Sequence, residues 1–287
     1  MPSLIDFRRR IRSVKNTQQI TKAMKMVSAA KLRRAQDRVI AARPYSKMLR
    51  EMLANVAAAA GDTEAAAEHP LLQVRPEKKA LLVVVTADRG LCGGFNGNLI
   101  KKAVSFIREN EGVEFSFELV GRKCRDFFKK RYQNVVGEMV GIFMKSPGYT
   151  DAMELSKRVM ERYASGEVDA VYLAVNEFKS VMAPNISLTK ILPLEVPKDA
   201  GASDYIYEQD PGELLGTLLP RYVEVQMYRA LLESAAAEHA ARMTAMDSAS
   251  SNAADVIDAL TLHMNRVRQA AITKEIIEIV SGASALE

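Results

Sequence analysis

Apolar residues in the last quarter of the chain recur at alternating intervals of three and four. This spacing places them along one face of a helix and is the seam pattern of a coiled coil. Some seam positions hold polar side chains, among them Arg229, His239 and Ser250, so the seam predicts only weak pairing and a need for further partners. The seam consists of Tyr222, Val225, Arg229, Leu232, Ala236, His239, Met243, Met246, Ser250, Ala253, Ile257, Leu260, Met264, Val267 and Ala271.

The first segment carries apolar residues on two faces of a predicted helix. One stripe consists of Leu4, Phe7, Ile11 and Val14. At 100° per residue, the opposite face receives Ile20, Ala23, Met24 and Val27. The simplest arrangement pairs this helix antiparallel with the C-terminal helix and leaves the Met24 face for another molecule. A wider core inside a helical bundle is the alternative.

Glycine is confined to the middle of the sequence. All 15 glycines lie between Gly61 and Gly216 or at Gly282, whereas helix formers dominate both ends. Pro44 and Pro220 each predict a kink or an end, and Pro220 is expected to start or kink the C-terminal helix near the middle region. Helices over 3–58 and 221–280 would be about 85 Å and about 90 Å long, more than an ordinary globular domain requires.

The middle of the chain alternates between strand and helix patterns. Strands are predicted over 80–87, 115–121, 134–142, 170–176 and 186–194, and helices over 98–108, 122–132 and 151–164. This alternation predicts a small, mainly parallel sheet flanked by helices. The predicted fold class is therefore α/β, with a small Rossmann-like domain and a long antiparallel two-helix coiled coil formed by both termini.

These patterns predict five segments. They are an N-terminal long helix (1–60), a linker (61–77), the α/β globular domain (78–196), a second linker (197–212) and a C-terminal long helix (213–287) that pairs with the first.

Composition narrows the class of protein. With 287 residues, 48% hydrophobic and 26% charged, the chain can form one large or two ordinary cored domains, which excludes disorder, collagen and disulfide scaffolds. The longest apolar run, 80–85, is far short of the roughly 20 residues that a membrane-spanning helix needs. We therefore expect a protein that is not integral to the membrane. The basic N-terminus is followed by no apolar signal core, so the sequence is interpreted as mature and cytoplasmic.

The net charge of +5 hides a strong asymmetry. Residues 1–60 carry 14 basic and 3 acidic side chains, whereas residues 211–287 carry 6 and 10. A basic helix is typical of a chain with an acidic partner, which is nucleic acid, an anionic membrane surface or an acidic protein surface. Phe7 and Tyr45 are the only aromatic residues before position 60, so base stacking is not provided for. A solvated charged face or an acidic protein surface is favoured over nucleic acid.

A glycine-rich loop, 88–97, follows the first predicted strand, where α/β folds bind phosphates. Its glycines do not form G-x-G-x-x-G, and no Gly-Lys-Ser/Thr occurs. A tight turn that needs positive φ is favoured over a nucleotide site.

The sequence contains few residues in patterns typical of a catalytic site. Cys92 lies in the glycine-rich loop with no histidine near it in sequence, so a small buried thiol is favoured over a nucleophile. Cys92 and Cys124 lie 32 positions apart, which indicates neither a zinc site nor a disulfide framework. The histidines at 69, 239 and 263 lie in a linker, on the seam and beside it, so packed or solvated side chains are expected. No catalytic, cofactor-binding or metal-binding residue is predicted.

Three blocks of sequence resemble the gamma subunit of bacterial F-type ATP synthases, the central rotor shaft, and the likeness covers essentially the whole chain. The first block is IRSVKNTQQITKAMKMV at 11–27 with AQDR at 35–38, and the second is DRGLCGG at 88–94. The third comprises EHAARMTAM at 238–246, NRVRQAAITKE at 265–275 and EIVSG at 278–282. The resemblance implies a coiled coil inside a ring of three alpha and three beta subunits around one gamma. The α/β domain would lie outside the ring, against epsilon and the membrane c-ring.

The resemblance also implies roles for individual residues. Contact with the acidic lever of beta is implied for Lys22, Met24 and Lys25. Contact with a loop of beta higher in the ring is implied for Arg268, Gln269 and Thr273, and a place in the upper bearing for Ile276, Ile277 and Val280. Contact with the membrane ring is implied for Tyr205, Tyr207 and Glu208. Lys25 stands where the family also has an acidic residue, which leaves the local lever contact open.

The implied function is rotation. Proton or sodium flow would turn the membrane ring and the shaft, whose asymmetric surface would take each beta subunit through its nucleotide-binding states. The chain would have no active site or cofactor of its own and would lie peripherally on the cytoplasmic side of the bacterial membrane. The two-cysteine insertion of chloroplast forms is missing, so thiol control of that type is not expected. An enzyme that binds a nucleotide in the glycine-rich loop and a basic nucleic-acid binder are the competing hypotheses.

Overall fold

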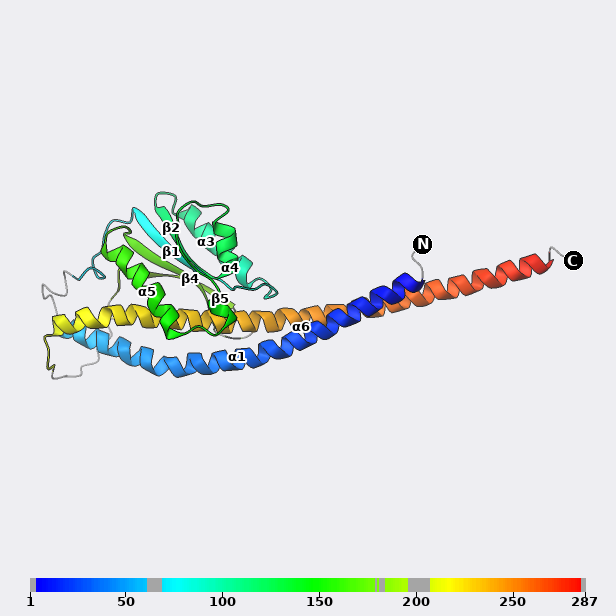
Figure 1. Cartoon of the computed structure of the whole chain (residues 1–287), viewed down its shortest axis with the longest axis horizontal. Helices are drawn as coiled ribbons and strands as arrows, with labels where there is room; N and C mark the ends of the chain where they lie inside the picture. Colours follow the sequence, from blue (N-terminus) through cyan, green and yellow to red (C-terminus); the bar gives the residue numbers. More distant parts are fainter. Residues whose placement is uncertain (1–3, 61–68, 179, 181–183, 196–206, 285–287) are drawn as a thin grey trace. The chain divides into compact units, whose positions relative to one another are not determined.

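A computed structural model describes residues 4–60, 69–178, 180, 184–195 and 207–284 (Figure 1). It divides into two compact units. The two-helix unit contains the residues up to Ser28 and those from Met243 onward, and the sheet unit contains Ala29–Arg242.

Two long helices belong to both units. Helix α1 covers Leu4–Ala60 and helix α6 covers Pro211–Ser284, at the two ends of the chain where glycine is scarce. Both predicted helices are therefore present. Pro44 lies inside α1, and Pro220 lies inside α6 rather than at its start, because α6 begins nine residues earlier.

The sheet unit contains five strands in the order β3-β2-β1-β4-β5. Strands β1, β2, β3 and β4 pair in parallel, and β5 pairs antiparallel with β4. The predicted small, mainly parallel sheet is thus confirmed. The strands are β1 (Lys79–Val85), β2 (Glu114–Val120), β3 (Val135–Met139), β4 (Ala170–Phe178) and β5 (Pro184–Leu192).

Four shorter helical elements connect the strands. They are α3 (Phe95–Glu109), α4 (Arg122–Phe128), the single 3₁₀ turn η1 (Ile142–Met144) and α5 (Tyr149–Ala164). The predicted helix over 122–132 and the predicted strand over 134–142 are both longer than the elements found. After Phe128 the chain turns so that Tyr132 packs its ring 5.3 Å from that of Phe128 and 4.9 Å from that of Phe117, and helix periodicity does not reveal this aromatic cluster.

The sheet is buried on both faces, as a parallel sheet must be. On one face, alternate residues of β1 such as Leu82 and Val84 pack against α3 and α4. On the other face, Leu81 and Val83 join a cluster with α5, the end of α1 and the first turns of α6. The long helices are therefore part of the core of the sheet unit.

A fully buried carboxylate sits inside this sheet. Glu118 on β2 has no exposed surface, and its carboxylate lies 3.3 Å from the guanidinium of Arg158 on α5. Burial raises the pKa of Glu118, and the charge of Arg158 opposes that shift. Gly137 faces Glu118 across the β2/β3 pairing, and a Cβ at Gly137 would lie 1.9 Å from a carboxylate oxygen. Only glycine leaves room for the buried ion pair.

We expect Gly137→Ala to lower the free energy of unfolding by about 2 kcal/mol or more, because the added methyl group must displace a buried charge from its partner. The measurement is urea denaturation of the full-length chain. Gly97→Ala is the control, since a Cβ there meets no atom within 4 Å in helix α3, and a gain of up to about 1 kcal/mol is expected. Equal midpoints for the two variants would contradict the packing argument.

Candidate functional surface of the two-helix unit

Three of the residue pairs that join the helices in the two-helix unit show their relative direction. As the residue number rises along α1, the partner's number falls along α6, so the helices are antiparallel as predicted. The pairs are Phe7 with His263 (ring centroids 4.9 Å apart), Thr21 with Ser250 (hydroxyls 2.6 Å apart) and Lys25 with Asp247 (2.5 Å).

The seam on α6 follows the predicted spacing. Met246, Ser250, Ala253 and Ile257 are all buried. Thr21 and Ser250 are buried too, and the Gln18 side chain donates a hydrogen bond to the carbonyl of Ser250. The polar seam position at Ser250 therefore has a partner on α1, which the sequence did not identify. Because many seam side chains are small or polar, the two helices bury little apolar surface between them.

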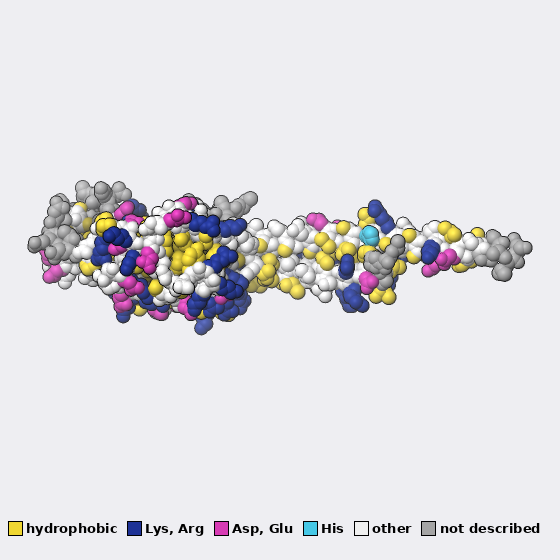
Figure 2. Space-filling model, turned by 90° about the horizontal axis from the view of Figure 1, so that it is seen from above, with side chains coloured by type: hydrophobic (Ala, Val, Ile, Leu, Met, Phe, Trp, Pro, Cys, Tyr) yellow, Lys and Arg dark blue, Asp and Glu magenta, His cyan; other side chains and the backbone are white. Residues whose placement is uncertain are grey.

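The predicted outward face of α1 is largely in solvent. Ile20 is 60% exposed and Val27 is 57% exposed, Ala23 and Lys22 are also exposed, and Met24 is half-buried. Figure 2 shows hydrophobic side chains at the surface of this slender part of the molecule. Within the two-helix unit, the described residues thus form a pair of helices with an uncovered apolar face, not the core of a wider bundle.

The last part of α6 is exposed on every side. Arg268, Gln269 and Thr273 are exposed, and so are the apolar residues that follow them. The apolar residues are Ile276 (55% exposed), Ile277 (58%), Ile279 (72%) and Val280 (59%). At 100° per residue these four lie within an arc of about 160°, and Lys274, Glu275 and Glu278 occupy the opposite side. A broad exposed apolar face of this kind marks a contact surface for another molecule.

The residues predicted to contact a membrane ring belong to the sheet unit. Tyr205 lies outside the described residues. Tyr207 is half-buried and packs against the larger hydrophobic cluster, whereas Glu208 is exposed. The other three groups of predicted site residues belong to the two-helix unit.

The glycine-rich loop is organised by an aspartate. The carboxylate of Asp88 accepts hydrogen bonds from the backbone N–H groups of Arg122, Gly141 and Phe143, at 2.9 to 3.0 Å. These donors follow β2 and β3, at the edge where a phosphate would bind. A phosphate would meet a carboxylate there instead of free N–H groups. Gly93 has φ of +55°, as expected for the tight turn.

Cys92 is buried in this loop, and burial raises the pKa of its thiol. The loop packs on α6 through Ala237, and Arg242 both donates to the carbonyl of Gly90 (3.3 Å) and pairs with Glu238 (2.6 Å). Burial lowers the pKa of His239 to about 4, so this imidazole is neutral at pH 7. The loop is a structural contact with α6. The buried Asp88 and Glu238 were not identified from the sequence as functional residues. Asp88 could have been found, because a carboxylate that follows a buried strand indicates a polar contact at the end of that strand.

The described residues contain no group of three or more His, Cys, Asp or Glu side chains placed to hold a metal ion. No helix in the described ranges combines the length and apolar character needed to cross a bilayer.

A family model described as ATP synthase matches residues 3–286. The ATP synthase gamma chain of Solibacter usitatus is 63% identical over 287 residues, with 100% of both chains covered. The chain belongs to the ATP synthase gamma family. A second gamma-family relative, from Pelotomaculum thermopropionicum, is 52% identical over 290 residues and is also covered over its full length.

Solved structures agree with this family assignment. The central stalk and c-ring structure of the Tetrahymena thermophila mitochondrial ATP synthase contains a chain that is 26% identical, with a TM-score of 0.62 over 80% of this chain and 99% of that one. A chain of the Euglena gracilis mitochondrial ATP synthase, at 18% identity, shares the fold with a TM-score of 0.69 over 99% of this chain and 94% of that one.

The two cysteines of this gamma-family chain are expected to resist alkylation in the folded state. Cys124 is fully buried, and burial raises its pKa to about 12, so little of the reactive thiolate exists at pH 8. Iodoacetamide should label both thiols at least about 100-fold more slowly in buffer than in denaturant. Mass spectrometry of each peptide gives the rate. Fast labelling of Cys92 in the folded chain would contradict its burial and would make it a candidate nucleophile.

Proposed function

We propose that this gamma-family chain is the central-stalk rotor subunit that transmits torque between an ion-driven membrane ring and the catalytic beta subunits. The observation that carries this proposal is the exposed apolar surface at the end of α6 and along the Met24 face of α1. Such a surface suits a rod that turns inside a closely fitting ring of other proteins. The two helices contain no glycine over 1–60 and 217–281, which favours stiffness along the rod.

Rotation would change the beta subunits through differential contact. The rod has a basic side and an apolar side, so in a threefold ring it meets each beta subunit with a different surface at any moment. A contact that favours one conformation over another shifts its population by the difference in contact energy. The proposal thus gives the gamma chain no catalytic step of its own, and it requires no cofactor.

The acidic lever of beta would meet the segment that contains Lys22, Met24 and Lys25. Lys25 is already paired with Asp247 on α6, and its side chain is 42% exposed. Lys22 is more exposed and lies about 160° around the helix from Met24. The pairing of Lys25 supports a division of roles in which Lys22 would supply a cation for the lever and Lys25 would serve mainly to hold α1 against α6.

Arg268, Gln269 and Thr273 would grip a loop of beta higher in the ring. Ile276, Ile277 and Val280 would form the upper bearing, where the exposed apolar face of α6 is covered by a collar of alpha and beta subunits. These contacts would also supply the burial that the narrow seam lacks.

The sheet unit would contact epsilon and the c-ring, with Glu208 and the segment around Tyr205 and Tyr207 on the ring side. This places the chain peripherally on the cytoplasmic side of the bacterial membrane, among three alpha and three beta subunits, with protons or sodium as the coupling ion. No role in nucleic-acid binding is proposed, since the basic face of α1 is assigned to acidic protein.

Affinity isolation of the chain from its native membranes tests the assignment. We expect two larger nucleotide-binding subunits at about three copies each per gamma chain, together with ATPase activity in the eluate that the purified chain alone lacks. Quantitative staining gives the stoichiometry. Recovery of the chain alone, or with nucleic acid, would overturn the proposal.

Met24→Lys should lower the number of ions pumped per ATP hydrolysed while leaving assembly intact, because it adds a charge at the beta contact. The measurement is ion uptake and ATP hydrolysis in the same membrane vesicles. Met48→Lys is the matched control, since it adds the same charge at a residue of α1 that is 59% exposed and belongs to the sheet unit, outside the proposed contact. Unchanged pumping per ATP in Met24→Lys, or equal losses in both variants, would contradict the lever role.

A further inference from the structure

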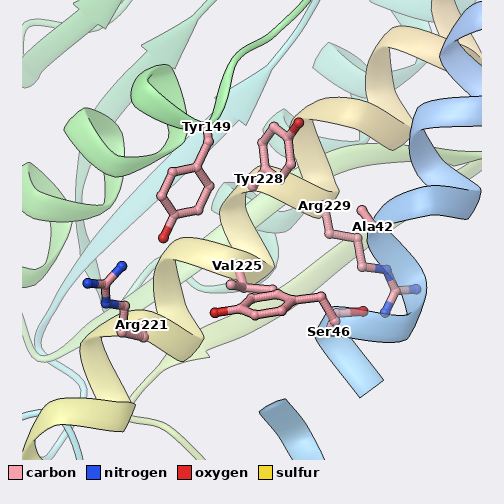
Figure 3. Close-up of a pocket in the computed structure, with 8 residues that line it drawn as sticks. Ala42, Ser46, Tyr149, Arg221, Val225, Tyr228 and Arg229 are labelled. Carbon is pink, nitrogen blue, oxygen red and sulfur yellow. The ribbon is translucent and has the colours of Figure 1, made fainter. Parts of the chain in front are cut away.

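A cavity of about 340 Å³ lies in the sheet unit between α1, the start of α5 and α6 (Figure 3). This volume falls at the lower end of the range for small-molecule sites, about 300–1,000 Å³. The cavity is lined by Ala42, Tyr45 and Ser46 of α1, Tyr149 of α5, and Arg221, Val225, Tyr228 and Arg229 of α6. It is separate from the glycine-rich loop.

The walls of the cavity are aromatic. The rings of Tyr149 and Tyr228 pack edge to face, with centroids 5.6 Å apart and planes at 83°, and Tyr45 adds a third ring from α1. The hydroxyl of Tyr149 donates a hydrogen bond of 2.6 Å to Glu224, which fixes that ring. Between the rings, the buried Val225 provides an apolar floor.

The space stays open because α1 presents small side chains to it. Ala42 and Ser46 flank Pro44, which removes a backbone donor and prevents a regular helical hydrogen bond at this point. Larger residues at these two positions would fill the gap between the helices.

Two guanidinium groups stand at the ends of the cavity. Arg221 and Arg229 are eight residues apart on α6 with Val225 midway, so their Cα atoms are about 12 Å apart along the helix. Arg229 pairs with Glu233 at 2.8 Å. Arg221 points toward the hydroxyl of Tyr149, and this hydroxyl together with the nearby charge of Glu224 raises the pKa of the guanidinium. Of the two cations, Arg229 has a carboxylate at ion-pair distance, whereas Arg221 is exposed and the carboxylate of Glu224 accepts a hydrogen bond from the hydroxyl of Tyr149.

We propose that this cavity binds an aromatic anion of mononucleotide size. The aromatic ring lies against the tyrosines over Val225, because a nucleobase-like ring stacks favourably on aromatic side chains. The phosphate or other anionic group meets Arg221, whose planar guanidinium binds such groups with two hydrogen bonds. Binding in the cavity therefore requires both the aromatic ring and the anionic group of the ligand.

Photolabelling with 8-azidoadenosine monophosphate tests this proposal on the full-length chain and on the complex that contains it. Labelling of the gamma chain should saturate below about 1 mM and should map to the peptides that contain Tyr149 or Tyr228. AMP should compete, whereas adenosine, which lacks the anion, and inorganic phosphate, which lacks the ring, should not compete at the same concentration.

Arg221→Gln should weaken the affinity about tenfold or more, because it removes a charge-assisted contact. Arg108→Gln is the matched control, since Arg108 is an exposed arginine at the end of α3, away from the cavity, and should leave labelling unchanged. Tyr228→Leu keeps an apolar wall but removes a stacking surface and should also reduce labelling.

Three outcomes would overturn the proposal. They are absence of label in these two peptides, equal competition by adenosine and AMP, and equal effects of Arg221→Gln and Arg108→Gln. Labelling of the isolated chain that vanishes in the complex would also overturn it, because a side chain of another subunit then occupies the cavity. None of these outcomes bears on the rotor assignment, which rests on subunit composition and ion pumping.

Discussion

Two paired helices can bury only one seam between them, and this limit governs the exposed surfaces of the chain. In the two-helix unit the seam uses small and polar residues such as Ser250 and Ala253, so it buries little apolar area. Apolar residues remain in solvent on the Met24 face and around the end of α6. Exposed apolar faces of this kind are unfavourable in water and mark surfaces for contact with other chains. The proposed ring of subunits would cover them.

The sheet unit packs against the two long helices, and its buried polar groups must be hydrogen-bonded if they are not to lower its stability. Its sheet is covered on both faces, and one cover consists of the end of α1 and the start of α6. Asp88 satisfies three backbone donors at the strand ends, and Arg242 links the glycine-rich loop to α6. Helices α1 and α6 are continuous through both units.

The hydrophobic periodicity of the sequence predicted much of the fold, but it did not predict which polar side chains would contact each other. The absence of glycine revealed both long helices, and the 3-4 spacing placed Met246 and Ile257 on the buried seam. Periodicity states which residues are apolar, but it does not state which polar atoms meet after folding. For this reason the contact of Thr21 with Ser250 and the fit of Gly137 against Glu118 needed coordinates. The proposed contact residues are readable only through family resemblance, because their partners lie outside the chain.

The polar seam contacts are best understood through register. A hydrogen bond between Thr21 and Ser250 and an ion pair between Lys25 and Asp247 are directional, and the exposed pair contributes at most about 1 kcal/mol to stability. Polar residues in a coiled-coil seam fix the register of the helices at a cost in stability. A rod that transmits torque fails if its helices slide past each other, while its stability can come from the surrounding ring. The seam residues therefore fix the register of the two helices and add little to their stability. A rod that rotates inside a surrounding ring needs fixed register more than it needs stability of its own.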